Sequence, residues 1–390
     1  GYRWQGGEFQ EQGFEFVPLA PAGSVSSSAE DMARFLVSFL RMGETETGRR
    51  MLGESAMENM QQIHFRHAPG LNGMAYGLMD LSHNGVRALG HGGDTLWFHS
   101  IFAFFPDEGF GLFASFNTDT ANTEHFYTSF VENYFPLEEH VPPPAQGYGD
   151  AERFAGSFRV NRYDHTDIGK IGALMGGVDI EAQEDGSLVT VSGERARWLR
   201  ESPTRFREDH GERRLVFREN DRGRITHAFL SDVPILALER TPLLERPRLQ
   251  LVLLASSMLL FALMAMGFPA LATLRRSYGV VLPEPRKLPT VGRVFAWAAA
   301  VCYLAFVVVT GLALSDPMEI VFGVPALLDG ALWLPILGAA FSLGALLFVF
   351  SAWRRSRGGF FARCFFSVVV LAGFVFLWQL FVWNMLGPRL

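Results

Sequence analysis

Four long apolar runs without a charged residue fill most of the C-terminal part of this sequence, between Leu251 and Leu386. An α-helix rises about 1.5 Å per residue, so each run reaches ~33 Å and can cross a hydrocarbon core ~30 Å thick. A buried core helix would explain one such run, but not four that are each flanked by charged or turn residues. The sequence therefore predicts four transmembrane helices within residues 249–388, at about 249–274, 294–315, 331–353 and 364–386.

The charges beside these runs indicate an orientation. Lys and Arg residues gather in segments 275–293 and 354–363, whereas segment 316–330 carries acidic residues and no basic ones. The positive-inside rule places the two basic segments in the cytoplasm, and residues 1–248 and the C-terminus outside. We therefore expect a multi-pass protein of the cell (cytoplasmic) membrane, with the lipid bilayer as a partner. The absence of charge within the runs favours an anchor over an ion path or a transporter.

The overall composition excludes several other classes of protein. A net charge of −6 and a pI near 6.0 argue against a nucleic-acid partner, because binding to phosphates needs an excess of basic residues. Cys302 and Cys364 are the only cysteines and both lie in apolar runs, so neither a disulfide framework nor a Cys-rich zinc site is expected. The spacing of His64 and His67 would place two rings on one helical face, but no third ligand is identifiable. We expect no metal and no cofactor.

The part of the chain before the apolar runs divides into two predicted domains. A first domain covers residues 1–138. Three consecutive prolines and two following glycines mark residues 139–149 as a linker. Residues 150–243 contain short alternating stretches, such as Gly156–Val160, separated by turn signals such as Glu184-Asp-Gly186. This pattern predicts a small antiparallel β domain.

Local signals in the first domain predict a helix and a β-hairpin. Ser28 and Asp31 have the spacing of a capping box, and apolar residues follow at helical intervals. Further along the chain, Ile101–Phe105 and Gly111–Phe116 are typical of two strands, joined by the turn Pro106-Asp-Glu-Gly109.

Three blocks of the first domain occur in an order and spacing that resemble a known family. They are Pro21–Leu36, Gly73–Met79 and a segment that starts Gly90-His-Gly-Gly-Asp94 and ends at Asn117. Together they resemble the C-terminal portion of the serine β-lactamase-related family, which includes class C β-lactamases, penicillin-binding DD-peptidases and esterases. Residues 150–243 are similar to the accessory domain that follows in many membrane-attached members.

The resemblance implies an α+β fold class. We expect a partial serine β-lactamase-like domain, made of an antiparallel sheet with helices, in the first part of the chain. A small antiparallel β domain and a four-helix, all-α transmembrane bundle should follow it.

The resemblance also implies acyl transfer on peptide, ester or lactam carbonyls. In the family, a Ser in Ser-x-x-Lys attacks the carbonyl, the Lys takes the proton, and a Tyr-x-Asn motif shares the acid–base work. A Lys-Thr-Gly or His-x-Gly triplet on an edge strand lines the cleft. Mapped onto this triplet, His91, Gly93 and Asp94 are the expected catalytic residues, with Asp94 giving a backbone N–H to the oxyanion. The expected substrate-binding residues are His91, Gly92 and Trp97.

Two motifs of the family are absent from the 390 residues. The only lysines are Lys170, three residues after Asp167, and Lys287, three residues after Glu284, so neither forms Ser-x-x-Lys. No Tyr is followed two residues later by Asn, and no Gly-x-Ser-x-Gly elbow occurs. We therefore expect a truncated portion of a longer serine hydrolase that is inactive alone.

Three functions compete on this basis. The leading one is a membrane-anchored extracytoplasmic serine hydrolase that acts on a small-molecule or cell-wall peptide or ester substrate. The alternative is a non-catalytic ligand- or peptide-binding membrane protein, a pseudoenzyme of the same family. A transporter component is the third, and the charge-free runs disfavour it. A Ser-x-x-Lys motif in upstream sequence would separate the first two.

Overall fold

The structure is a computed structural model that describes residues 1–17, 20–136, 149–191, 195–279, 288–315 and 324–388. The predicted linker 139–149, apart from its last residue, lies outside the described residues. The same holds for the charged residues of segments 280–287 and 316–323, which contributed to the predicted orientation.

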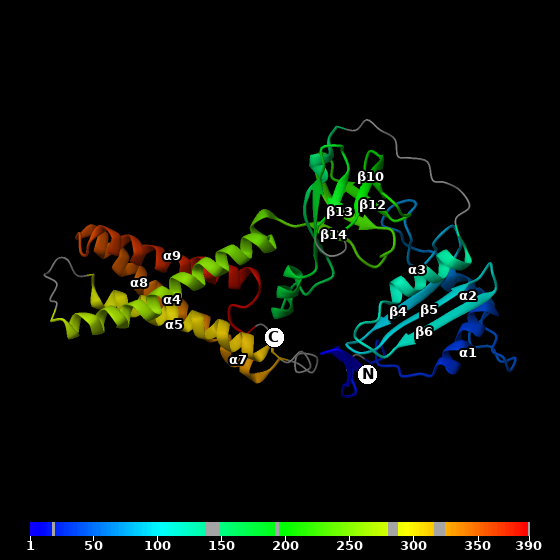
Figure 1. Cartoon of the computed structure of the whole chain (residues 1–390), viewed down its shortest axis with the longest axis horizontal. Helices are drawn as coiled ribbons and strands as arrows, with labels where there is room; N and C mark the ends of the chain where they lie inside the picture. The colour runs from blue at the N-terminus through cyan, green and yellow to red at the C-terminus, as the bar shows by residue number, and fades with distance from the viewer. Residues whose placement is uncertain (18–19, 137–148, 192–194, 280–287, 316–323, 389–390) are drawn as a thin grey trace. The chain divides into compact units, whose positions relative to one another are not determined.

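The chain divides into two compact units (Figure 1). The first unit contains a sheet with helices and a separate β-barrel, and the second contains the apolar helices. A short segment between two barrel strands belongs to the second unit rather than to the barrel. The first unit is Gly1–Arg162 with Gly177–Arg240, and the second is Tyr163–Gly176 with Thr241–Leu390.

An antiparallel sheet in the order β3-β4-β5-β6 is the centre of the N-terminal part of the first unit. Helices α1 and α2 precede it in the chain, and α3 follows it. Strands β5 and β6 are the predicted hairpin, which is therefore confirmed. The bounds are α1 Ala29–Leu40, α2 Glu54–Gln61, β3 Met79–Asp80, β4 Leu89–Asp94, β5 His99–Phe105, β6 Phe110–Phe116 and α3 Thr123–Tyr134.

Strand β5 is buried on both of its faces. Successive side chains of a strand point to opposite faces, so alternate residues of β5 contact different helices. Phe102 and Phe104 face α1, where the Phe39 ring lies with centroid distances of 5.6 and 5.1 Å. Phe105 faces α3 and stacks near Tyr127, with ring centroids 6.3 Å apart. Burial on both faces explains why β5 is a continuous apolar run rather than an alternating one.

Helix α1 begins where the capping box predicts. Ser28 is the N-cap residue, and its side-chain oxygen accepts a hydrogen bond from the Asp31 N–H at 3.1 Å. Glu30 and Asp31 both pair with Arg34, at 2.6 and 3.1 Å. The cap satisfies an N–H group that lacks a partner within the helix, and the acidic pair suits the positive end of the helix dipole. The predicted capping box is confirmed.

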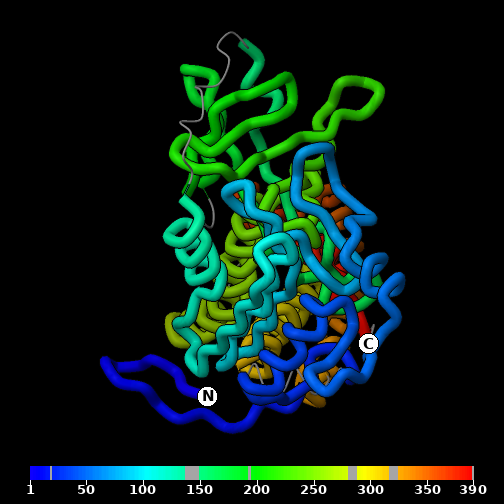
Figure 2. The backbone as a smooth tube through the Cα atoms, turned by 90° about the vertical axis from the view of Figure 1, so that its right-hand side faces the viewer, coloured from blue at the N-terminus to red at the C-terminus, as the bar shows by residue number. Residues whose placement is uncertain are grey.

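A smaller hairpin lies at the N-terminus and projects as an extended ribbon (Figure 2). Its strands β1 (Tyr2–Gln5) and β2 (Glu8–Glu11) pair with each other and expose all of their side chains. The Tyr2 N–H donates to the Asn117 carbonyl at 2.8 Å, and the Asp119 N–H donates to the Tyr2 carbonyl at 3.1 Å. These two bonds hold the hairpin against the chain that leaves β6.

The second part of the first unit is a closed antiparallel barrel in the order β10-β11-β12-β13-β14-β7-β8-β9. Large side chains, among them Phe154, Phe158 and Trp198, fill its core. The antiparallel character predicted for this region is confirmed, but the sequence did not predict closure. The bounds are β7 Gly156–Val160, β8 Gly177–Ala182, β9 Leu188–Thr190, β10 Arg197–Ser202, β11 Arg205–Glu208, β12 Arg214–Glu219, β13 Ile225–Leu230 and β14 Leu238–Arg240.

The turn between β8 and β9 should make the stability of the barrel depend on pH. Asp185 accepts hydrogen bonds from the Ser187 hydroxyl at 2.6 Å and the Ser187 N–H at 3.0 Å, and it also pairs with Arg197. These contacts, led by the Ser187 hydroxyl, hold the pKa of Asp185 to about 2, below its ordinary 3.8. A carboxylate with a lowered folded-state pKa stabilises the fold above its unfolded pKa, and this contribution is lost as pH falls through the folded value.

We therefore expect an Asp185→Asn variant to lose less stability than the natural chain when the pH falls from about 4 to about 2. Thermal unfolding followed by the tryptophan signal at each pH measures the two slopes. Equal slopes for variant and natural chain would contradict the prediction.

Long apolar helices form most of the second unit, which also contains the short segment Tyr163–Gly176. Within the described ranges, four helical stretches are long and apolar enough to cross a membrane. The chain is thus a membrane protein, and the predicted number of spans is confirmed. The helices are α4 Pro247–Ser277, α5 Thr290–Ala313, α7 Ala326–Ala331, α8 Leu334–Arg354 and α9 Phe360–Val382, of which α7 and α8 together make one stretch.

Every predicted span differs from the observed helices by a few residues, and α5 and α9 each begin four residues earlier than predicted. Two of the differences have a visible cause. The predicted span 331–353 is interrupted by two residues between α7 and α8, with Pro335 in the first turn of α8. A proline lacks an N–H donor and clashes with the preceding turn, so it is favoured in the first turn of a helix, where that N–H has no partner within the helix. Helix α9 ends at Val382 rather than near residue 386. Asn384 has a left-handed φ of 56° there, a conformation that stops a helix.

A buried polar cluster joins the start of α4 to the end of α9. Gln379 donates from Nε2 to the backbone oxygen of Gln250 at 2.9 Å and to its side-chain Oε1 at 2.8 Å. Trp383 Nε1 donates to the same Oε1 at 3.1 Å. All three residues are buried, so the Gln379 and Trp383 donors depend on Gln250 for their partners.

We expect Gln379→Leu to destabilise the helix bundle by ~1 kcal/mol, the usual size of a hydrogen bond between membrane helices. The matched control is Leu371→Ala at an exposed position of the same helix, which should shift the transition less. Unfolding of both variants in mixed micelles checks this. If Gln379→Leu unfolds like the natural chain, the cluster does not stabilise the bundle.

Candidate functional site

Among the residues that the structure describes, four of the six residues of strand β4 have no neighbouring strand on one side. Strand β3 pairs only with the start of β4, through two residue pairs that end at Gly90. From His91 to Asp94, β4 pairs with β5 alone among the strands that the structure describes. The His91-Gly-Gly triplet therefore lies on an open sheet edge, where the resemblance placed it.

Hydrogen bonds near the two ends of β4 show which backbone groups face this open edge. The Leu81 N–H donates to the Ala88 carbonyl at 2.9 Å, so even-numbered residues of this strand direct their backbone groups toward the β3 side. At the other end, the Thr95 N–H donates to the carbonyl of Phe98, just before β5, at 2.8 Å. Odd-numbered residues therefore direct their backbone groups toward β5, which fits the same alternation. The N–H groups of Gly92 and Asp94 consequently point out of the open edge, where they can donate to a bound carbonyl oxygen.

A cavity of about 280 Å³ lies beside His91. Residues from all three sequence blocks meet in its lining, although they lie far apart in the chain. A small apolar cavity with a few polar groups on one side is typical of a ligand site. Its lining consists of His91, Gly92, Gly93 and Ser100 on the polar side, and of Met32, Phe35, Phe39, Met60, Gly77, Leu78, Phe102 and Phe113 on the apolar side.

The structure does not bring every predicted site residue into this cavity. His91, Gly92 and Gly93 line it, and His91 Nδ1 donates to the neighbouring Gly92 carbonyl. The Asp94 carboxylate instead contacts His99 Nδ1 at 2.7 Å, so only the backbone N–H of Asp94 can take the predicted role. Trp97 lies in the turn beyond β4 and does not line the cavity.

The sequence did not single out Met32 or Phe35 as site residues. Helical spacing identified them as part of the apolar face of α1, and such a face is more often core than ligand contact. Their position beside His91 depends on how α1 packs against the sheet, for which the sequence carries no local signal.

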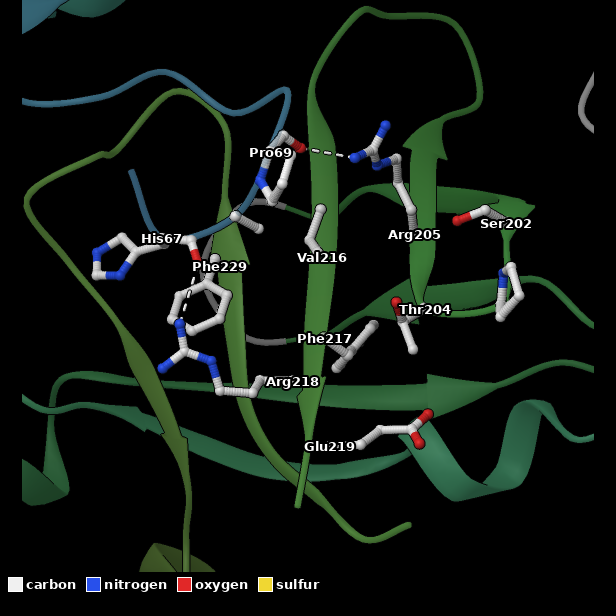
Figure 3. Close-up of a pocket in the computed structure, with 12 residues that line it drawn as sticks. His67, Pro69, Ser202, Thr204, Arg205, Val216, Phe217, Arg218, Glu219 and Phe229 are labelled. Atoms are coloured by element: carbon white, nitrogen blue, oxygen red, sulfur yellow. Dashed lines mark hydrogen bonds between the residues drawn. The ribbon is translucent and has the colours of Figure 1, made fainter. Parts of the chain in front are cut away.

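A second and larger cavity, of about 480 Å³, lies between the loop around His67 and the barrel strands β11, β12 and β13 (Figure 3). Arg205 donates to the Pro69 carbonyl at 2.6 Å, and Arg218 donates to the His67 carbonyl at 3.0 Å. The His67 ring stacks on the Phe229 ring with centroids 4.6 Å apart. The Arg218 guanidinium lies 4.7 Å from the centroid of the Phe229 ring. The two arginines thus clamp the loop to the barrel.

Burial, and to a smaller extent the Arg218 cation, lower the pKa of His67 below its ordinary value. His67 also lies in an irregular loop rather than on a helix, so it does not share a helical face with His64. Among the residues that the structure describes, no group of three or more His, Cys, Asp or Glu side chains is arranged to hold a metal ion.

We expect Arg218→Ala to loosen the loop around His67, because it removes the hydrogen bond to the His67 carbonyl. One hydrogen bond from a charged donor corresponds to ~1.5 kcal/mol, or roughly tenfold faster amide exchange in residues 64–71. Arg222→Ala, in an exposed turn of the same barrel, is the control and should leave exchange unchanged. Hydrogen exchange read by mass spectrometry measures both. Unchanged exchange in Arg218→Ala would show that Arg218 does not hold the loop around His67 against the barrel.

The comparison with protein families gives one match. Residues 2–131 match the family model described as Beta-lactamase. A search of curated proteins found no match. The matched range contains the three sequence blocks, the sheet β3–β6 and every residue that lines the cavity beside His91.

Several solved structures are similar to parts of the chain. The crystal structure of SurE matches with 18% identity and a TM-score of 0.40, over 62% of this chain and 55% of that chain. The octameric penicillin-binding protein homologue from Pyrococcus abyssi matches with 13% identity and a TM-score of 0.26, over 54% of this chain and 46% of that one. A D-stereospecific amidohydrolase from Streptomyces sp. matches with 26% identity and a TM-score of 0.23, over 28% of this chain and 30% of that one. The chain thus spans about half the length of the first of these proteins.

The family match and the sequence blocks agree on one part of the chain. The sheet, the helix capped by Ser28 and the His91-Gly-Gly edge all lie in the matched range. Residues 2–131 thus match the Beta-lactamase family model and form a β-lactamase-like domain.

Proposed function

We propose that this chain supplies one wall of the acyl-transfer site of a membrane-anchored, extracytoplasmic serine hydrolase. The open edge of β4 carries this proposal. It combines His91, two outward N–H groups at Gly92 and Asp94, and an adjacent cavity within a β-lactamase-family domain. The substrate would be a peptide, ester or lactam carbonyl, from a small molecule or from cell-wall material.

Each part of the edge has a role in this proposal. An acyl group that lies along β4 would place its carbonyl oxygen near the outward N–H of Asp94, which stabilises the oxyanion formed on attack. His91 would orient an anionic substrate or stabilise the ionised base. Gly92 and Gly93 let the ligand approach the backbone closely, because they carry no Cβ.

The nucleophile and its base would come from outside the 390 residues, because no Ser-x-x-Lys or Tyr-x-Asn motif occurs within them. We therefore propose that the chain is inactive alone. The domain limits 1–138, 150–243 and 249–388 remain part of the proposal, as does the extracytoplasmic position of residues 1–248.

Covalent labelling tests the proposed function. The purified chain should remain unlabelled by a fluorophosphonate or a fluorescent β-lactam, whereas the native protein from its source membranes should be labelled at a serine outside these residues. Labelling at a serine within Gly1–Leu390 would overturn the proposed inactivity. A native protein that reacts with neither probe but binds cell-wall peptides reversibly would support the pseudoenzyme alternative.

The orientation has its own test. Protease added to intact spheroplasts should digest the domains before α4 and spare the basic loop between α8 and α9. Cleavage of that loop, with the N-terminal domains intact, would reverse the proposed topology.

A further inference from the structure

A carboxylate from a distant part of the chain occupies the turn that follows β4. Glu15 accepts hydrogen bonds from the Leu96 N–H at 2.7 Å, the Trp97 N–H at 3.0 Å and the Thr95 hydroxyl at 2.6 Å. Two successive backbone N–H groups that point into one concavity form a nest, which is a recurrent anion-binding arrangement. Bonds to an ionised acceptor are about twice as strong as neutral ones.

The turn holds these donors in place through bonds of its own. The Thr95 N–H donates to the Phe98 carbonyl at 2.8 Å, and the Phe98 N–H donates to the Thr95 hydroxyl oxygen at 3.0 Å. Within the described ranges, the N–H groups of Leu96 and Trp97 have hydrogen bonds to Glu15 and to no other group. They would therefore remain directed outward, without a partner, if the carboxylate left.

The segment that carries Glu15 has few other attachments. From Gly13 to Val17, the described chain makes no backbone–backbone hydrogen bond. Phe14 and Phe16 expose 66% and 65% of their surface, so apolar burial does not fix the segment either. The Glu15 carboxylate is thus the principal polar tether of this segment.

We infer that the Thr95–Phe98 turn is a carboxylate-binding site, that Glu15 is its resident occupant, and that a carboxylate-bearing ligand competes with Glu15 for it. The turn begins four residues beyond His91, or ~13 Å along an extended strand. It is distinct from the cavity beside His91, because none of its three donor residues lines that cavity. Binding of the ligand releases the segment Gly13–Val17.

Acetate is the probe for the site, in the full chain held in detergent micelles. With selective ¹⁵N labelling of Leu and Trp, Glu15→Ala should shift the Leu96 and Trp97 amide signals, and acetate should then move them saturably toward their natural positions. In the natural chain, where Glu15 already occupies the turn, acetate should compete only at a much higher concentration. Glu11→Ala, which removes an exposed carboxylate of β2, is the control and should match the natural chain.

A second measurement leaves the segment Gly13–Val17 unchanged. Thr95→Val removes one of the three donors, and we expect chymotrypsin to cut after Phe14 or Phe16 roughly fivefold faster than in the natural chain. Thr95→Ser keeps the hydroxyl and should be cut at the natural rate. The inference is overturned if Glu15→Ala leaves both amide signals in place, or if acetate has no saturable effect on that variant. Equal cleavage of the Val and Ser variants would equally contradict it.

Discussion

Replacing Gly90 with alanine is expected to lower the unfolding temperature of the β-lactamase-like N-terminal domain by roughly 10 °C, which corresponds to about 3 kcal/mol in a domain of this size. An added Cβ at this position would lie 2.1 Å from the Phe102 carbonyl oxygen, 2.8 Å from Leu81 Cδ1 and 2.9 Å from Ala103 Cα. Two of these neighbours are backbone atoms of β5, so the strands β4 and β5 would have to separate. The cost should therefore exceed that of ordinary overpacking by a side chain.

Gly92 provides the matched control, two residues further along the same strand. A Cβ there would meet nothing closer than the Ser100 carbonyl at 3.9 Å. Gly92→Ala should be neutral or slightly stabilising, by up to ~1 kcal/mol, because alanine restricts the unfolded chain. Thermal melts followed by limited proteolysis of the N-terminal domain compare the two variants. Similar melts for both would mean that β4 and β5 are not packed as described.

Replacing His91 with alanine is expected to lower kcat/KM for acyl transfer about a hundredfold in the native protein from its source membranes, a typical loss for one preorganised electrostatic group. His91 is the titratable side chain in the lining of the cavity beside β4, so no other lining residue can supply its charge or donor. His91→Lys should retain most of the activity, because a lysine takes this position in many members of the family that the sequence resembles.

His125→Ala is the control for this prediction. His125 lies in the first turn of α3, outside the lining of the cavity beside His91, and its loss should change kcat/KM by less than twofold. Hydrolysis of a chromogenic ester, measured for all three variants at matched protein concentration, separates the outcomes. If His91→Ala retains more than half of the natural activity, His91 is not part of the reacting site.

Much of the architecture could be predicted because its signals are local. The capping box at Ser28, the hairpin β5–β6 and the apolar runs each depend on residues a few positions apart, and the structure contains all three. The predicted helix bounds were wrong where a local backbone signal opposed the hydropathy of an apolar run. Pro335 divides a run that hydropathy alone treats as one helix, and Asn384 ends another helix early.

The candidate site could be predicted only in part. His91, Gly92 and Gly93 lie on one strand and line a cavity, and their roles there stay a prediction. Trp97 and the Asp94 carboxylate lie outside that lining, because the turn after β4 directs them elsewhere. Glu15 was not predicted at all, since no sequence pattern links a residue near the N-terminus to a turn eighty residues later.

The apolar runs of the four candidate spans and the alternating stretches of the β domain are local patterns, whereas the strand that carries the His91 triplet followed from the family resemblance. Periodicity and hydropathy act over a single turn or strand, so they are visible without the fold. Long-range packing, in contrast, sets where β3 ends: it pairs only with the start of β4, which opens the edge beside His91. The same packing places residues of α1 in the lining of the cavity and Glu15 in the turn that follows β4. Such features depend on which distant segments pack together, and packing is the sum of many weak contacts between residues far apart in the chain.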